Sequence, residues 1–226
     1  MDQQRFSQFV LTLLLILPLW GCQSAIEKAA RNTGYSAYEL IGIEKRDLLK
    51  SRVSKARSEQ KEASENFESA LDRLKALTAF DGGNLERQYK SLQSAYDRSA
   101  EQAGHVRQSI EKVETVAADL YEEWEKEIAE IQTASLKSSS QQKLRDTKKK
   151  SDSLVAALKK SEKSMTPVLA KLKDQVLFLK HNLNAQAVGS LKGESVRIQG
   201  DIEKLLKEMN QSISEADRFI KEIETN

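Results

Sequence analysis

The sequence predicts an all-α fold, an elongated antiparallel bundle of four long helices that pack as in a coiled coil. Glycine and proline supply only eleven of the 226 residues, about 5% against roughly 12% in an average chain, which argues against folds with frequent turns. Apolar residues recur in alternating steps of three and four, the spacing of a helix that keeps one stripe against its neighbours. Charged residues make up 31% of the chain, as expected for long helices with solvated outer faces.

Residues 1–21 are predicted to be a lipoprotein signal peptide. The largely apolar run 9–19 would span about 16 Å as a helix, half of a hydrocarbon core of about 30 Å, so it has the length of a signal sequence rather than a transmembrane helix. It leads into Leu19-Trp20-Gly21-Cys22, which resembles a bacterial lipobox. We therefore expect cleavage after Gly21 and lipidation of Cys22, the only cysteine of the chain.

Residues 22–34 are then a lipidated tether, and residues 35–226 form the helical bundle domain. Several acyl chains on one cysteine would anchor the protein to a membrane almost irreversibly. Gln23, not aspartate, follows the cysteine, and resemblance to sorted lipoproteins then implies the outer membrane, with the domain facing the periplasm. Exposure at the cell surface is an open alternative.

Two apolar seams predict the first two helices. The first runs from Leu49 to Leu77 and is followed by Asp81-Gly82-Gly83-Asn84, where glycine permits positive φ and asparagine can cap the next helix. The second continues from residue 85 to about 134 and places Trp124 in the core. The polar patch 135–140 is predicted to be the turn that follows.

Two further seams, 144–183 and 191–223, predict the rest of the bundle. A turn near 189–193, where Gly189 and Gly193 weaken a helix, would give four helices that all have partners. The alternative is three helices, the last of them very long, with a tail that pairs in a dimer. The sequence leaves open whether residues 141–224 form one helix or two.

Charge supports a hairpin between the second and third helices. Residues 111–130 carry a net charge of −6 and residues 137–175 a net charge of +7. Antiparallel pairing would set the acids between 123 and 130 against Arg145 and the Lys148-Lys149-Lys150 run. Exposed pairs of this kind contribute well under about 1 kcal/mol each, so they select a partner more than they stabilise it.

The residues offer little catalytic chemistry. His105 and His181 are expected on outer faces, and neither has a second histidine one turn away for a metal site. No nucleophile elbow, phosphate-binding glycine loop or Cys-x-x-Cys motif is found. A net charge of +2 gives no excess for nucleic acid. We therefore expect no enzyme, cofactor, metal or nucleic-acid partner.

One segment has more apolar side chains than a seam needs. Residues 176–179 are four consecutive hydrophobic residues, followed by an amide-rich stretch. A wider core at this point is the simpler interpretation. The alternative is a patch that docks a partner protein, formed by Leu177, Phe178 and His181.

Four segments resemble a domain-of-unknown-function family of predicted helical lipoproteins from Gram-negative bacteria. They are residues 42–49, the turn 80–83, residues 120–125 and residues 177–187. The likeness extends over residues 34–224. It implies a helical lipoprotein and brings no activity, ligand or catalytic residue.

The sequence thus predicts a membrane-anchored coiled-coil tether or protein-binding scaffold without catalysis, whose partner is an envelope protein that the sequence does not identify. A homo-oligomer is left open. The alternative function is a helical module that binds or shapes a membrane surface, for which Lys148-Lys149-Lys150 could contact headgroups.

Overall fold

The computed structural model describes residues 28, 31, 44–80 and 82–225, and the chain divides into two units, 1–44 and 45–226. In the first unit, Lys28 and Arg31 are helical. The predictions for the signal peptide 1–21, for lipidation of Cys22 and for the tether 22–34 otherwise lie outside the described residues.

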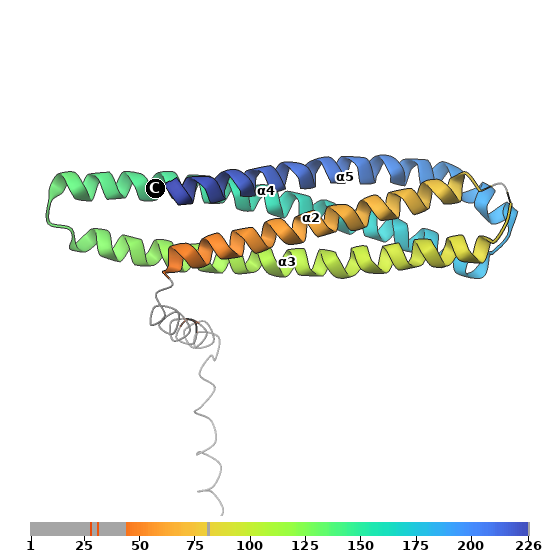
Figure 1. Cartoon of the computed structure of the whole chain (residues 1–226), viewed down its shortest axis with the longest axis horizontal. Coiled ribbons are helices and arrows are strands. Elements are labelled where there is room, and N and C mark those ends of the chain that lie inside the picture. Colours follow the sequence, from red (N-terminus) through yellow and green to blue (C-terminus); the bar gives the residue numbers. More distant parts are fainter. Residues whose placement is uncertain (1–27, 29–30, 32–43, 81, 226) are drawn as a thin grey trace, which may run out of the picture. The chain divides into compact units, whose positions relative to one another are not determined.

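The second unit is an all-α bundle of four helices, as predicted (Figure 1). They are α2 (Lys45–Thr78), α3 (Leu85–Glu130), α4 (Ala134–His181) and α5 (Ala185–Thr225). At about 1.5 Å per residue, α2 is about 50 Å long and α4 about 70 Å. Residues 141–224 therefore belong to two helices, and the three-helix alternative is wrong.

The helices form a ring in which each packs against two others. Helix α2 contacts α3 and α5, and α4 contacts the same two helices. Helices α2 and α4 thus face each other across the centre, as do α3 and α5.

The predicted seams form the core. All nine positions of the first seam and all ten of the last are buried. Those of the first are Leu49, Val53, Ala56, Gln60, Ala63, Phe67, Ala70, Leu74 and Leu77, and those of the last are Leu191, Ser195, Ile198, Ile202, Leu205, Met209, Ser212, Ala216, Phe219 and Ile223. The 3–4 spacing therefore identified the inner faces of α2 and α5 correctly.

The turn between α2 and α3 lies where the sequence predicts it. Gly82 and Gly83 both have positive φ, 152° and 109°. Asn84 caps α3, since its side-chain oxygen accepts a hydrogen bond from the Arg87 backbone N–H at 2.9 Å. The glycines supply a backbone conformation that other residues adopt only with strain.

The other two turns differ from the prediction. The α3–α4 turn is Ile131–Thr133, not residues 135–140, which are helical. Ile131 and Thr133 have extended backbones, which suits β-branched residues, whereas a serine run is tolerated within a helix.

The turn between α4 and α5 is Asn182–Asn184, and Gly189 and Gly193 lie within α5. Asn184 caps α5 by accepting a hydrogen bond from the Ala187 N–H at 2.9 Å. The Asn182 amide donates to the Phe178 carbonyl at 2.9 Å. Asparagine therefore ends one helix and starts the next, a role that the prediction gave to glycine.

The buried stripe of α3 changes near the α3–α4 turn. Tyr121 and Ile128 are buried, whereas Leu120, Trp124 and Ile131 are only partly buried. The prediction that Trp124 is fully buried is therefore wrong. Helix α2 starts beside Glu123, so from this point α3 has lost one of its two neighbours and turns its apolar side toward α4. Figure 1 shows α3 and α4 continuing together past the start of α2 and the end of α5.

Candidate functional site

A layer of polar side chains crosses the middle of the apolar core. Gln60 of α2 is fully buried, and its side-chain amide donates to the Ser161 hydroxyl of α4 at 2.7 Å. Ser161 also approaches the Ser212 hydroxyl of α5 at 3.5 Å. This layer therefore links the diagonal helices α2 and α4 directly. The side-chain carbonyl of Gln60 is buried without a hydrogen-bond partner among the described residues.

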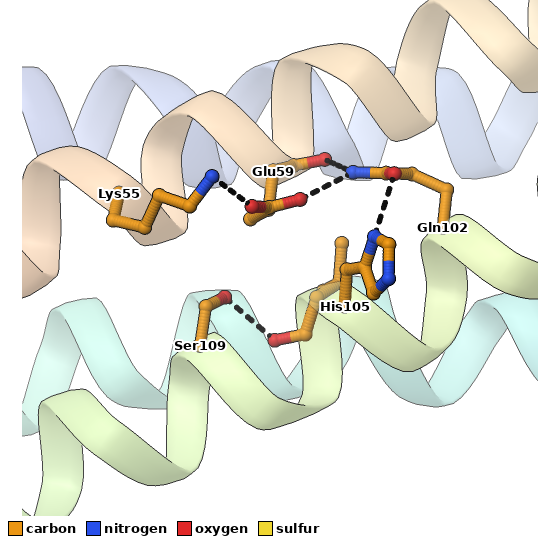
Figure 2. A network of polar contacts seen from close by, with 6 residues as sticks. Lys55, Glu59, Gln102, His105 and Ser109 are labelled. Atoms are coloured by element: carbon orange, nitrogen blue, oxygen red, sulfur yellow. Dashed lines mark hydrogen bonds and ion pairs between the residues drawn. The ribbon is translucent and has the colours of Figure 1, made fainter.

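A second polar cluster joins α2 to α3 (Figure 2). One oxygen of the Glu59 carboxylate forms an ion pair with Lys55 Nζ, and the other accepts a hydrogen bond from Gln102 Nε2, each at 2.5 Å. Gln102 Nε2 also lies 3.2 Å from the Glu59 backbone carbonyl, and Gln102 Oε1 lies 3.2 Å from His105 Nδ1. Because both carboxylate oxygens are engaged, Glu59 serves as a cross-link between the two helices.

The pKa of Glu59 lies below its ordinary value of 4.5. Burial by itself would raise this pKa, but the hydrogen bonds from Lys55 and Gln102 and the charge of Lys55 outweigh it. Elsewhere, the hydrogen bond from Ser164 lowers the pKa of Glu208. Burial raises the pKa of Tyr121, which lies under the ammonium group of Lys148.

The predicted charge pairing of the α3–α4 hairpin is confirmed for one pair. Lys148 binds Glu125 across the hairpin. Glu123 instead binds Lys45 of α2 at 2.8 Å, and Lys150 binds Glu222 of α5 at 3.0 Å. The charged residues that were predicted to pair within one hairpin therefore form ion pairs that involve all four helices.

Both histidines lie on the outer surface, as the seams predict. No group of three or more His, Cys, Asp or Glu side chains among the described residues could hold a metal ion. In the same part of the chain, no helix is both long and apolar enough to cross a bilayer.

The predicted docking residues are exposed at the end of the bundle that holds the α4–α5 turn. Leu177 is 47% exposed and Phe178 39%, and His181 is also exposed. Leu183 joins them with 42% exposure, although the sequence placed it in the core seam. Because α4 ends at His181, Leu183 leaves the helical register and lies in the turn. We call Leu177, Phe178, His181 and Leu183 the end patch.

Sequence reasoning did not find the Glu59–Gln102 cluster. Glu59 and Gln102 each directly precede a seam position, Gln60 and Ala103, where a charged or amide side chain normally faces water. Their burial depends on where α2 packs against α3. The hydrophobic pattern within a single helix carries no information about that contact.

Fold and surface together define an all-α bundle protein whose core is crossed by polar cross-links and whose apolar end patch faces solvent. The chain belongs to the family described as "Protein of unknown function (DUF2959)", whose sequence model matches residues 34–223. The resemblance to a domain-of-unknown-function family is thereby confirmed. A search of curated proteins gives no match.

Proposed function

We propose that this protein is a lipid-anchored tether of the bacterial envelope, held in the outer membrane through Cys22 with its bundle in the periplasm. Cys22 directly follows an apolar run of signal-peptide length. The protein acts as a spacer and scaffold, and no catalytic step is part of this proposal.

The separation of the two ends of the bundle is the observation that carries this proposal. The chain enters the bundle at Lys45, whose ammonium group lies 2.8 Å from Glu123. The turn between α4 and α5, which the end patch adjoins, lies at the opposite end of the bundle (Figure 1). Helix α2 spans about 50 Å between them. A lipid anchor ahead of Lys45 would therefore hold one end near its membrane and leave the end patch to contact another component of the envelope.

The end patch supports a contact role because its apolar side chains are clustered. Single exposed hydrophobic residues are common on protein surfaces, whereas grouped ones mark interaction sites. Leu177, Phe178 and Leu183 lie within seven residues of one another, and all three are exposed. A patch that docks a partner protein was the alternative interpretation of this segment in the sequence, beside a wider core.

The alternative function, a module that lies on or shapes a membrane through Lys148-Lys149-Lys150, has less support. Lys148 and Lys150 are engaged with Glu125 and Glu222. A basic surface that must bind headgroups would have to give up these pairs.

Replacement of Cys22 tests the anchor. Cells that express the full chain are labelled with radioactive palmitate, and their membranes are separated on a density gradient. The wild-type chain should take up label and fractionate with the outer membrane. Cys22→Ser should remain an unlabelled precursor that is not cleaved after Gly21. Labelling of Cys22→Ser, or wild-type protein without label, would contradict the proposed anchor.

A further inference from the structure

The bundle end that carries the end patch holds several basic side chains that take part in no ion pair in the part of the chain that the structure describes. Its helix segments are 72–78, 85–92, 171–181 and 185–197, which together carry nine basic and four acidic side chains. Four of the nine, Lys75, Lys90, Lys171 and Arg197, are paired with Glu203, Glu86, Asp201 and Glu194. The other five, Arg73, Arg87, Lys173, Lys180 and Lys192, take part in no ion pair within the described residues, so uncompensated basic charge lies around the exposed apolar residues.

Lysines flank the end patch on α4. Leu177 lies four residues after Lys173 and three before Lys180, so all three side chains lie on one side of the helix. Neither lysine takes part in an ion pair within the described residues, whereas Lys159, Lys160 and Lys171 of the same helix do. Asp174, one turn before Phe178, is the single acid of this stretch.

We propose that this end of the bundle binds an anionic phospholipid surface. Leu177, Phe178 and Leu183 would enter the interfacial region, while Lys173 and Lys180 contact lipid phosphates. Basic side chains beside exposed apolar ones are the combination by which peripheral proteins bind such surfaces. Charge complementarity favours this occupant over a protein, because the basic side chains without an ion pair among the described residues come from all four helices at this end and not from one pocket.

This inference rests on the proposed function, since together they make the protein a bridge between two membranes. The lipid on Cys22 would hold one membrane and the end patch would bind the other. The bundle would set the spacing between them.

A vesicle-bridging experiment on the full lipidated chain tests the two contacts separately. The chain is reconstituted through its acyl groups into neutral phosphatidylcholine vesicles, and its flotation with them reports on the anchor. Fluorescent acceptor vesicles, either neutral or rich in phosphatidylglycerol, are then added, and their co-sedimentation reports on the end patch. We expect capture of anionic acceptors, no capture of neutral ones, and loss of capture as salt rises.

Variants test which side chains make the contact with the acceptor vesicles. Lys173→Gln and Lys180→Gln should each weaken capture about five-fold, and the double variant Leu177→Ser, Phe178→Ser should abolish it. Leu136→Ser is the matched control, because Leu136 is an exposed leucine of α4, 61% exposed, near the opposite end of the same helix. Circular dichroism and urea unfolding establish that each variant keeps the fold.

The outcomes distinguish the two proposals. If the chain fails to float with the neutral vesicles, the anchor is wrong, and the end patch is then tested by direct binding of the Cys22→Ser chain to anionic vesicles. Equal capture of neutral and anionic vesicles, absence of capture, or capture that the end-patch variants leave unchanged would overturn the lipid-binding inference. Binding of this end to an envelope protein but not to vesicles would overturn it as well.

Discussion

Replacing Gln60 by leucine should stabilise the bundle, although it removes a buried hydrogen bond. Gln60 Nε2 donates to Ser161 Oγ at 2.7 Å, while Gln60 Oε1 is buried without a partner among the described residues. A buried hydrogen bond contributes about 1 kcal/mol net, and an unsatisfied buried polar group costs about 1–3 kcal/mol. Leucine removes both the hydrogen bond and the unsatisfied carbonyl, and it fills a similar space with apolar atoms.

The partners of Gln60 remain satisfied after the change. Ser161 Oγ donates to the Leu158 carbonyl at 3.0 Å, and Ser212 Oγ donates to the Met209 carbonyl at 2.8 Å. No hydroxyl is therefore stranded in the core. Losing the hydrogen bond and removing the unsatisfied carbonyl together favour Gln60→Leu by about 0–2 kcal/mol, which should raise the melting temperature by up to about 6 °C in a domain of this size.

Urea unfolding followed by circular dichroism measures the effect. The midpoint should rise for Gln60→Leu with an unchanged slope, since the surface exposed on unfolding stays the same. Gln108→Leu on the exposed surface of α3 is the control and should change stability by less than about 0.5 kcal/mol. Gln60→Ala should lower stability, because it leaves a cavity.

The opposite result for leucine would refute this reasoning. If Gln60→Leu destabilised the bundle by more than about 1 kcal/mol, the hydrogen bond across the diagonal would be worth more than the unsatisfied carbonyl costs. The polar layer would then be a source of stability and not only a constraint on how the helices align.

Three further predictions concern the remaining polar contacts. The folded-state pKa of Glu59 is depressed, so the contribution of Glu59 to stability is present above its ordinary pKa of 4.5 and is lost as the pH falls through the lower folded value. The urea midpoints of wild type and Glu59→Gln should therefore differ at neutral pH and converge in acid. A difference that stays constant with pH would contradict this. Trp124 is partly buried, so in a Trp20→Phe background its emission should lie between buried and water-exposed values, and Trp124→Ala should cost about 1–2 kcal/mol, below the 3–5 typical of a fully buried aromatic. A double-mutant cycle that reverses Lys148 and Glu125, which are 37% and 56% exposed, should give a coupling of about 0.3–0.5 kcal/mol, and zero coupling would remove this pair from hairpin pairing.

The sequence was sufficient to predict the buried faces of the helices, because the spacing of buried positions is a property of each helix by itself. Positions such as Gln60, Ser161 and Ser212 were placed in seams by spacing alone, against their polarity, and all three are buried. A residue three or four positions from two buried neighbours lies on the same side of the helix whatever its chemistry.

The turns and the end of the α3 seam were not predictable in the same way. Gly189 and Gly193 are helical, because a glycine in a helix costs only about 1 kcal/mol and neighbouring helices supply more than that. Tyr121 is buried more deeply than Leu120 because α2 starts beside Glu123. That boundary depends on where another helix begins, and a pattern within α3 does not contain it.

The end patch was only half determined by the sequence. The excess of apolar residues at 176–179 indicated it, but a wider core was the simpler explanation of the same excess. The choice depended on which of these residues face the neighbouring helices. Helix α5 returns alongside this part of α4, where Ser195 Oγ donates to Gln175 Oε1 at 3.1 Å. Val176 and Leu179 take the buried positions, and Leu177 and Phe178 remain exposed.

The closed ring of helices has a consequence for how the bundle folds. Helix α2 packs against α5, and the pairs Lys50–Glu224 and Arg57–Asp217 join them at 2.6 and 3.1 Å. The first helix of the bundle to be synthesised therefore gains its second neighbour only when the last one arrives. Two hairpins can form from local contacts, but their union requires pairing between the two ends of the domain, which is slow because a long loop must close. The cooperativity of unfolding should thus depend on the interface between α2 and α5. A chain truncated within α5 would leave part of the apolar side of α2 exposed to solvent.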